Sequence, residues 1–499
     1  MGLFLFASKT LISVFTASCT CGMGYLNLLL LVVLLWVFFI PSSYELHPSQ
    51  TQVLLQIRKL LEYPSSLQTW ENYSGDLCNL RKSAHVSITC QDSFITELKI
   101  MGDKLVKVSE FHGFAIPNVT LSEGFSIDSF VTTLTRLTSL KVLSLVSLGI
   151  WGPLPDKIHR LYSLELLDLS SNFMYGSIPP KISRLVKLHT LTLDSNHFND
   201  TVPDWLDSFS NLTILSLKSN GFKGQIPFSV SKIKTLTDLV LSHNELSGKL
   251  PDLSTLTNLH VLNIIENHLD SELPVMPKEL VTVLLCNNSL SGEIPEQFGE
   301  LHKLQHLDLS FNHLSGTPPS ALFSLPNISY LNLGSNMLSG SLPDELSCGD
   351  KLGFVDLSSN KLIGQLPSCL NSTSDKRYVK IGGNCLSRDS KDQREGSHCL
   401  ISSKQSRGRD IAVEVAVISG AVLVMVLLGL GVLLLCKRCR SRTQEQHVLS
   451  KNVQANTPTG ISSELLANAS KFHIDQFIFL SFVQNPRHAC PTHSVNFVV

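Results

Sequence analysis

A pattern of leucines, asparagine and proline recurs along the middle of the chain. In each unit, apolar residues lie five and three positions before an asparagine, and a G-x-I/L-P phrase such as Gly224–Pro227 follows most of these asparagines. Successive asparagines are 24, 24, 24, 23, 21, 24, 24 and 24 residues apart. They are Asn172, Asn196, Asn220, Asn244, Asn267, Asn288, Asn312, Asn336 and Asn360. A fixed period of this kind predicts a stack of small repeated units.

The composition of one repeat indicates how it folds. The alternating segment before each asparagine predicts a short strand whose leucines point into the core. The asparagine amide can satisfy backbone groups where the chain leaves the strand, and glycine and proline shape the turn that follows. A tenth unit around Leu140–Pro155 has Leu148 in place of asparagine, and Ile95–Ile100 is a further partial strand. We therefore expect an α/β repeat solenoid of about ten units over residues 95–370.

A stack of repeats needs a cap at each end. Residues 44–94 are expected to form the N-terminal cap, because apolar residues there lie on one helical face and Trp70 follows. Those apolar residues are Val53, Leu54, Ile57, Leu60 and Leu61. Residues 371–410 are expected to form the C-terminal cap and the juxtamembrane segment.

The cysteines between these limits suggest disulfides of a secreted protein. Cys78 is expected to pair with Cys90. We favour Cys348–Cys369 and Cys385–Cys399, although four cysteines allow three pairings. Cys286 is left over as either a free thiol or an interchain partner, and an unpaired thiol without a role is the simpler interpretation.

Two uncharged apolar runs flank the repeats. The run from Leu26 to Ile40 is short and precedes small residues, so residues 1–43 are interpreted as a signal peptide, with an N-terminal anchor as the alternative. Residues 1–22 form an unusual lead, because Met23 would be a more ordinary start. The run from Val415 to Leu435 has the length of a membrane span, and residues 411–436 are predicted to form a transmembrane helix. Basic residues follow it directly, which places the N-terminus outside and residues 437–499 in the cytoplasm of a plasma-membrane protein.

Composition supports this class and excludes others. Hydrophobic residues make up 43% of the 499 residues, charged residues 16%, and the net charge is −1. This balance argues against a disordered protein and against general binding to nucleic acid. Seven N-x-S/T sequons outside the predicted membrane helix mark candidate glycosylation sites. They are Asn72, Asn118, Asn199, Asn211, Asn287, Asn327 and Asn371.

Three phrases carry a resemblance to a known family. LVSLGIWGPLPDKIHRL, SELPVMPKELVTVLLCNNSLSGEIPEQFG and LSCGDKLGFVDLSSNKLIGQLPSCL resemble the plant leucine-rich-repeat receptor-like kinases of the inactive group. TPTGISSELLANASKF looks like the juxtamembrane segment of that group, so the resemblance covers roughly residues 45–473. It implies a plant-type leucine-rich-repeat solenoid and an extracellular peptide or protein ligand, with another receptor kinase as a partner.

The sequence departs from that family in its last part. The lysine, HRD, DFG and APE signatures of a kinase are not found after the predicted helix, so we expect no enzymatic activity from these residues. His488, Cys490 and His493 have no second cluster of ligands, and no metal or cofactor is expected. We favour a receptor, co-receptor or decoy without catalysis. The alternatives are a truncated receptor-like kinase or pseudokinase and a wall-associated hydrolase inhibitor.

The concave strand face is the expected ligand surface. Aspartate four residues before the asparagine is an ordinary solvated residue in such a repeat, so Phe311 and Tyr330, two aromatics in adjacent units, are the main indication of a binding patch. The candidate binding residues are Phe311, Tyr330, Asp308, His306, Asp238 and Lys218.

Overall fold

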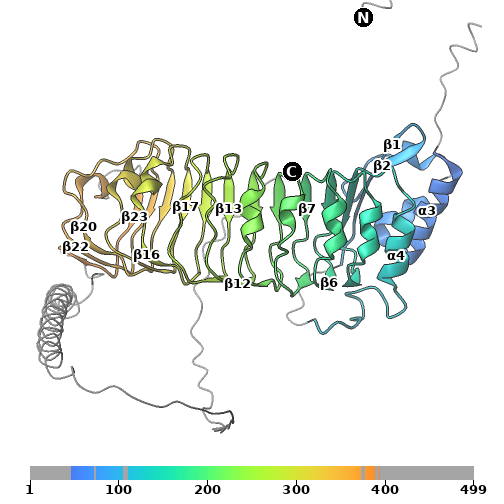
Figure 1. Cartoon of the computed structure of the whole chain (residues 1–499), viewed down its shortest axis with the longest axis horizontal. Helices are drawn as coiled ribbons and strands as arrows, with labels where there is room; N and C mark the ends of the chain where they lie inside the picture. The colour runs from blue at the N-terminus through green and yellow to red at the C-terminus, as the bar shows by residue number, and fades with distance from the viewer. Residues whose placement is uncertain are drawn as a thin grey trace, which may run out of the picture. The chain divides into compact units, whose positions relative to one another are not determined.

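The chain divides into two compact units of repeats. The computed structural model describes residues 46–71, 73, 75–104, 111–371, 377–387 and 393. Unit 1 contains the described residues up to Lys223 together with Lys232–Asp238, and unit 2 contains Gly224–Ser231 and the described residues from Leu239 onward. Within each unit, short strands follow one another in chain order (Figure 1). The boundary falls within β10 (Lys223–Gly224), η6 (Phe228–Lys232) and β11 (Asp238–Val240).

Unit 1 begins with the predicted helical cap. Helix α3 (Pro48–Leu60) buries Val53, Leu54 and Ile57, which are at most 2% exposed. Trp70 is buried in the 3₁₀ helix η1 (Ser65–Trp70). This confirms the helical face and its aromatic neighbour.

A disulfide and a hairpin complete the cap. Cys78 in η2 (Leu77–Asn79) is bonded to Cys90 in β1 (Val86–Gln91), as predicted. Strand β1 pairs antiparallel with β2 (Phe94–Met101), which contains the predicted partial strand and pairs in parallel with the first repeat strand. Helix α4 (Ile127–Leu134), which the repeat pattern did not predict, precedes that strand, and the Ser126 side chain caps its N-terminus.

The repeats of unit 1 form one parallel sheet and a second, smaller sheet. The first sheet has the order β1-β2-β3-β5-β7-β9, and its repeat strands are β3 (Val142–Val146), β5 (Leu166–Asp168), β7 (Thr190–Thr192) and β9 (Ile214–Ser216). The second sheet contains β4 (Trp151–Pro153), β6 (Phe173–Gly176) and β8 (His197–Phe198). Between them the chain forms the 3₁₀ helices η3 (Asp156–Arg160), η4 (Pro180–Arg184) and η5 (Leu206–Ser208).

Unit 2 repeats the same plan. Its main parallel sheet consists of β13 (Val261–Asn263), β15 (Thr282–Leu284), β17 (His306–Asp308), β19 (Tyr330–Asn332), β21 (Phe354–Asp356) and β23 (Tyr378–Lys380). Short strands on the other side are β12 (Glu245–Gly248), β14 (His268–Leu269), β16 (Ser291–Glu293), β18 (His313–Ser315), β20 (Ser339–Ser341), β22 (Lys361–Gly364) and β24 (Cys385–Leu386). The 3₁₀ helices η7 (Glu296–Glu300), η8 (Ser320–Ser324) and η9 (Ser368–Leu370) complete this unit.

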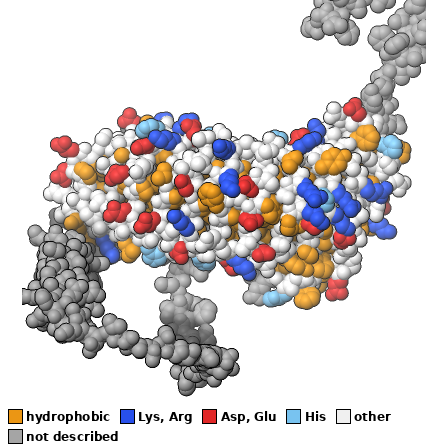
Figure 2. Space-filling view, in the orientation of Figure 1, with side chains coloured by type: hydrophobic (Ala, Val, Ile, Leu, Met, Phe, Trp, Pro, Cys, Tyr) orange, Lys and Arg blue, Asp and Glu red, His pale blue; other side chains and the backbone are white. Residues whose placement is uncertain are grey.

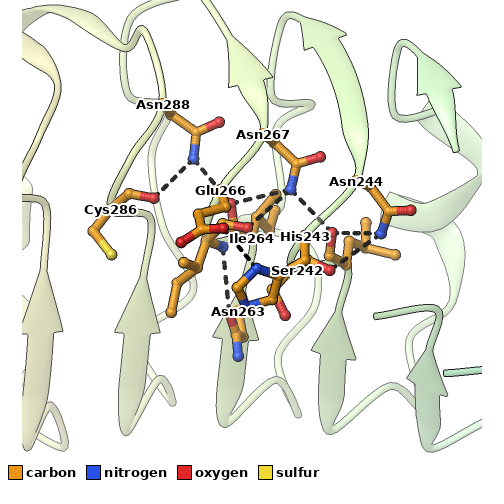
Figure 3. Close-up of polar contacts among 11 residues, drawn as sticks. Ser242, His243, Asn244, Asn263, Ile264, Glu266, Asn267, Cys286 and Asn288 are labelled. Atoms are coloured by element: carbon orange, nitrogen blue, oxygen red, sulfur yellow. Dashed lines mark hydrogen bonds and ion pairs between the residues drawn. The ribbon is translucent and has the colours of Figure 1, made fainter. Parts of the chain in front are cut away.

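The repeat asparagines connect each repeat to the one before it. Asn288 donates from Nδ2 to the carbonyls of Ile264 at 2.9 Å, Leu285 at 3.2 Å and Cys286 at 3.3 Å, and its Oδ1 accepts from the Leu269 N–H at 3.1 Å. Figure 3 shows the bonds that the asparagine Nδ2 atoms donate in three successive repeats of unit 2. All nine predicted asparagines except Asn220 are buried. The predicted role of the asparagine is therefore confirmed, since each amide satisfies backbone groups that have no strand partner.

A strained turn precedes each of these asparagines. The preceding residue has a φ between 52° and 60° in all nine repeats, although none of these residues is glycine. The left-handed region is unfavourable for a side chain with a Cβ, and Phe311 adopts it with a φ of 54°. The asparagine hydrogen bonds hold the turn in this conformation.

The repeat continues beyond residue 370, where the sequence pattern was expected to end. Asn384 lies 24 residues after Asn360 and makes the same bonds, donating to the carbonyls of Leu357 at 2.8 Å and Ile381 at 3.0 Å. Strand β23 pairs in parallel with β21. The Arg377 guanidinium closes this end of the stack by donating to three backbone carbonyls, those of Leu352, Cys369 and Gly349.

The remaining cysteine predictions have different outcomes. Cys348 and Cys369 are bonded, as expected. Cys286 is 1% exposed and disulfide-bonded, so the prediction of an unpaired thiol is wrong. The spacing of leucines and asparagines placed Cys286 two residues before a repeat asparagine, but it contained no information about whether its thiol forms a disulfide. Cys385 is also disulfide-bonded, and its predicted partner Cys399 lies outside the described residues.

The two predicted membrane-related segments, residues 1–43 and 411–436, and the tail at 437–499 lie outside the described residues. Across the ranges given above, no helix combines the length and the apolar character required to span a bilayer.

Candidate ligand-binding face

Four rings form a row on the main sheet of unit 2, in which Tyr330, Phe354 and Tyr378 are stacked and His306 is tilted against Tyr330. His306, Tyr330, Phe354 and Tyr378 are direct partners in the parallel register of β17, β19, β21 and β23, and we call them the aromatic ladder. Their ring centroids are separated by 6.3, 4.5 and 5.7 Å in that order. The ring planes of Tyr330 and Phe354 are nearly parallel, with an angle of 4° between them. Because the ring faces are directed along the row, the ladder turns ring edges toward a ligand.

A second row of register partners lies two residues further along the same strands. This polar row consists of Asp308, Asn332, Asp356 and Lys380. In-register parallel pairing places equivalent residues of successive repeats side by side. The repeat length therefore determines which residues form each row, and residues adjacent in the sequence do not.

Asp308 is the most constrained member of the polar row. It is 4% exposed, and Ser310 donates to its Oδ1 from the backbone N–H at 3.0 Å and from Oγ at 2.6 Å. Asn332 Nδ2 and the Tyr330 hydroxyl donate to its Oδ2 at 3.1 and 3.3 Å. Burial raises the pKa of Asp308, and burial together with the Asp308 charge raises the pKa of the Tyr330 hydroxyl. With four donors already bound, this carboxylate positions its neighbours and is poorly suited to act as a base.

The other end of the polar row is more open. Tyr378 is 61% exposed, and the Lys380 side chain is 46% exposed. The Lys380 Nζ lies 3.5 Å from Asp356, 5.5 Å from the centre of the Phe354 ring and 5.8 Å from that of Tyr378. A cation held against aromatic rings and one carboxylate can still approach an acidic group of a ligand.

The structure places the predicted binding residues in three different settings. His306, Asp308 and Tyr330 belong to the two rows. Phe311 is half-buried in the strained turn after β17, so the rings beside Tyr330 are His306 and Phe354.

Lys218 and Asp238 belong to unit 1. The Lys218 N–H donates to Asp194, and Asp238 accepts from the Thr237 hydroxyl. Of the aspartates four residues before a repeat asparagine, which were expected to be solvated, Asp308 and Asp356 are buried and Asp168 is half-buried. Burial raises the pKa of Asp308.

Four members of the two rows were missed from the sequence. Phe354 and Asn332 follow from counting six and four residues back from a repeat asparagine. Tyr378 and Lys380 required the recognition of Asn384, which lies in phase with the other asparagines.

The sequon asparagines differ in exposure. Asn118, Asn199, Asn211 and Asn371 are exposed, Asn287 and Asn327 are half-buried, and Asn72 lies outside the described residues. No group of three histidine, cysteine or acidic side chains able to hold a metal ion occurs in the part of the chain that is described.

Comparisons with known proteins agree with this geometry. The profile of the family "Leucine-rich repeat region" matches residues 102–369. A "Probable inactive leucine-rich repeat receptor-like protein kinase" of Arabidopsis thaliana is 50% identical over 459 residues, which is 90% of this chain and 55% of that protein. A "Probable LRR receptor-like serine/threonine-protein kinase" of the same plant is 35% identical over 280 residues, which is 56% of this chain and 30% of that protein. The chain therefore spans at most about half the length of these relatives.

Two solved structures have a similar fold. The crystal structure of PEPR1-AtPEP1 matches with a TM-score of 0.54 and 28% identity over 68% of this chain and 49% of that one. The LRR ectodomain of the plant membrane receptor kinase GASSHO1/SCHENGEN3 from Arabidopsis thaliana, in complex with CASPARIAN STRIP INTEGRITY FACTOR 2, matches with a TM-score of 0.52 and 27% identity. That match covers 67% of this chain and 44% of the other.

Proposed function

Because the chain belongs to the leucine-rich-repeat family, and its relatives are named as plant receptor-like kinases, we propose that it recognises a peptide or protein ligand outside the cell. The similar GASSHO1/SCHENGEN3 ectodomain, solved in complex with CASPARIAN STRIP INTEGRITY FACTOR 2, supports this proposal. The ligand binds along the concave strand face of unit 2.

The aromatic ladder carries this proposal. Its three centroid separations of 6.3, 4.5 and 5.7 Å give a row whose length matches about five residues of extended peptide, at about 3.3 Å per residue. Ring edges carry a partial positive charge, which suits carbonyl oxygens and the faces of aromatic side chains. Lys380 supplies a cation for an acidic ligand group at the end of the row.

The same proposal includes the place of the protein in the cell. It acts at the plasma membrane as a receptor, co-receptor or decoy, with its N-terminus outside, glycans on sequon asparagines and a single helix at residues 411–436. Another receptor kinase is its expected partner, and its own role is binding without catalysis. The Cys78–Cys90 and Cys348–Cys369 disulfides support a secretory route.

Selection of peptides by the full chain tests the ladder. Full-length protein in neutral detergent is panned against a displayed library of short random peptides, and the affinities of the enriched peptides are then measured. Tyr378→Ser should weaken the selected peptides by about tenfold or more, because exposed aromatic anchors dominate such interfaces. The matched control is Tyr162→Ser, which removes an equally exposed tyrosine (60%) from a loop of unit 1 and should leave affinity unchanged.

A second variant protects the result against a folding artefact. Phe354→Leu keeps an apolar side chain in the ladder but removes the ring between Tyr330 and Tyr378, and it should also weaken binding. If folded Tyr378→Ser and Phe354→Leu proteins enrich the same peptides with unchanged affinity, the concave face of unit 2 is not the ligand site.

A further inference from the structure

The outer face of unit 1, which carries α4 and the 3₁₀ helices, has arginines in phase with the repeats. Arg136 follows α4, Arg160 ends η3 and Arg184 ends η4, and successive members are 24 residues apart. We call them the arginine row. All three are exposed, and α4, η3 and η4 contact one another in chain order. Lysine and arginine side chains gather on the visible face of this part of the molecule (Figure 2).

Acidic residues of this region neutralise three of its lysines but none of the arginines. Lys157 pairs with Asp128 at 2.7 Å, Lys181 with Asp156 at 3.0 Å and Lys141 with Glu165 at 3.5 Å.

Arg136 donates to the neutral Gln56 side chain at 3.2 Å. Within the described part of the chain, no carboxylate lies within ion-pair distance of Arg136, Arg160, Arg184 or the exposed Lys187. Residues 127–189 contain seven lysines and arginines against four acidic residues, a net charge of +3 in a chain whose total is −1. One of those four, Asp168, lies on strand β5 of the main sheet.

The fold does not require arginine at this position. The residue 24 positions after Arg184 is Ser208, and the equivalent positions twelve residues before Asn312 and Asn336 are Glu300 and Ser324. Serine and glutamate therefore fit the same place in the repeat. Arginine stands at this position only in the first three repeats, although Lys232, which pairs with Asp207, has the same offset from Asn244. The arginine row therefore calls for an explanation other than folding.

We propose that the arginine row binds an acidic polysaccharide. A linear polyanion with regularly spaced carboxylates matches charges that recur once per repeat along a stack, and guanidinium groups bind carboxylates through paired hydrogen bonds. Because the row lies on the outer face, the polymer leaves the concave face accessible. The inference rests on the extracellular location in the proposed function, but not on the aromatic ladder as the peptide site.

Retention on immobilised polygalacturonate tests the row. The full chain in neutral detergent is applied at low ionic strength and eluted with a salt gradient, with uncharged dextran beads as the blank. The triple variant Arg136→Ser, Arg160→Ser and Arg184→Ser uses the residue that the repeat itself has at Ser208. We expect it to lose about tenfold or more in apparent affinity, with a shallower dependence on salt, because fewer counterions are displaced.

The matched control removes the same charge elsewhere. Lys249→Ser, Lys278→Ser and Lys303→Ser together take three exposed positive charges from unit 2 and should leave retention unchanged. Tyr378→Ser should also be retained normally, which separates a failure of this inference from a failure of the peptide site.

Three results would overturn the inference. One is the absence of retention of the wild-type chain at low salt, and another is equal loss in the arginine and lysine variants. The third is binding to vesicles containing phosphatidylserine without binding to polygalacturonate, which would make the row a lipid contact.

Discussion

Asn312→Ala tests how much stability one repeat asparagine contributes. Its Nδ2 donates to the carbonyls of Leu285, Leu309 and Ser310 at 3.0–3.1 Å, and its Oδ1 accepts from the Leu290 N–H at 3.0 Å. The carbonyls keep other donors after the substitution, since Asn288 and Asn336 also bond to the carbonyls of Leu285 and Leu309. The Leu290 N–H, however, would be left buried without its partner.

The expected loss follows from this inventory. One buried N–H without a partner costs about 1–3 kcal/mol, and each weakened bond to the shared carbonyls adds about 0.5 kcal/mol or more. We therefore expect Asn312→Ala to lower the free energy of unfolding of its part of the stack by about 2–4 kcal/mol. With a urea dependence of about 1–3 kcal/mol per molar, the midpoint should fall by about 1 M or more.

Pulse proteolysis of the full chain in urea, with intact protein detected by an antibody to the repeats, measures this midpoint. Gln297→Ala is the matched control, because Gln297 is an exposed carboxamide in η7 of the same unit, outside the repeat-asparagine position, and its removal should change stability by less than about 0.5 kcal/mol. If Asn312→Ala and Gln297→Ala unfold at the same urea concentration, the asparagine bonds do not hold the repeats together.

Three further predictions concern the end of the stack and the polar row. Arg377→Ala should cost about 2 kcal/mol and speed amide hydrogen exchange in the last repeats only, because three backbone carbonyls lose their donor. Replacing Cys348 and Cys369 by serine should cost about 3 kcal/mol in the same urea experiment, as expected for a loop closed across 21 positions. Asp308 has a raised pKa in the folded state, so the folded chain holds its proton more tightly than the unfolded chain. The stability from this group is complete below the unfolded pKa of about 3.9 and is lost as pH rises through the folded value, and Asp308→Asn should remove this fall from the pH profile of the urea midpoint.

The repeat phase was predictable because it is a one-dimensional signal. Leucines and asparagine at fixed offsets are sufficient to place the strands, and the helical cap and the pairs Cys78–Cys90 and Cys348–Cys369 followed from local pattern and order along the chain. Asn384 was overlooked because no G-x-I/L-P phrase follows it, although its spacing of 24 and the apolar residues Val379 and Ile381 before it were available. The state of Cys286 could not be predicted, since a disulfide depends on which cysteine the fold brings near it.

The candidate site was less predictable because its neighbours are one repeat apart. Tyr330 and Phe311 are closer in sequence than Tyr330 and Phe354, yet the ring stacked on Tyr330 is that of Phe354. The parallel register determines this, because residues at the same offset from their asparagines become direct partners. Aromatic residues should therefore be compared between equivalent positions of successive repeats, and not by their distance along the chain.

The division of roles within a repeat separates stability from recognition. The leucines are buried, and the asparagines are nearly all buried and hydrogen-bonded to the backbone, so replacement of either acts on folding. The ladder position varies freely, from Thr190 and Ile214 in unit 1 to Tyr330 and Phe354 in unit 2, without any change in the strand pairing. A substitution there loses at most an aromatic contact of about 0.5–1.5 kcal/mol beyond its buried area. On the ligand site proposed above, relatives with the same repeat would bind different ligands, and their specificities should diverge at the position six residues before each asparagine.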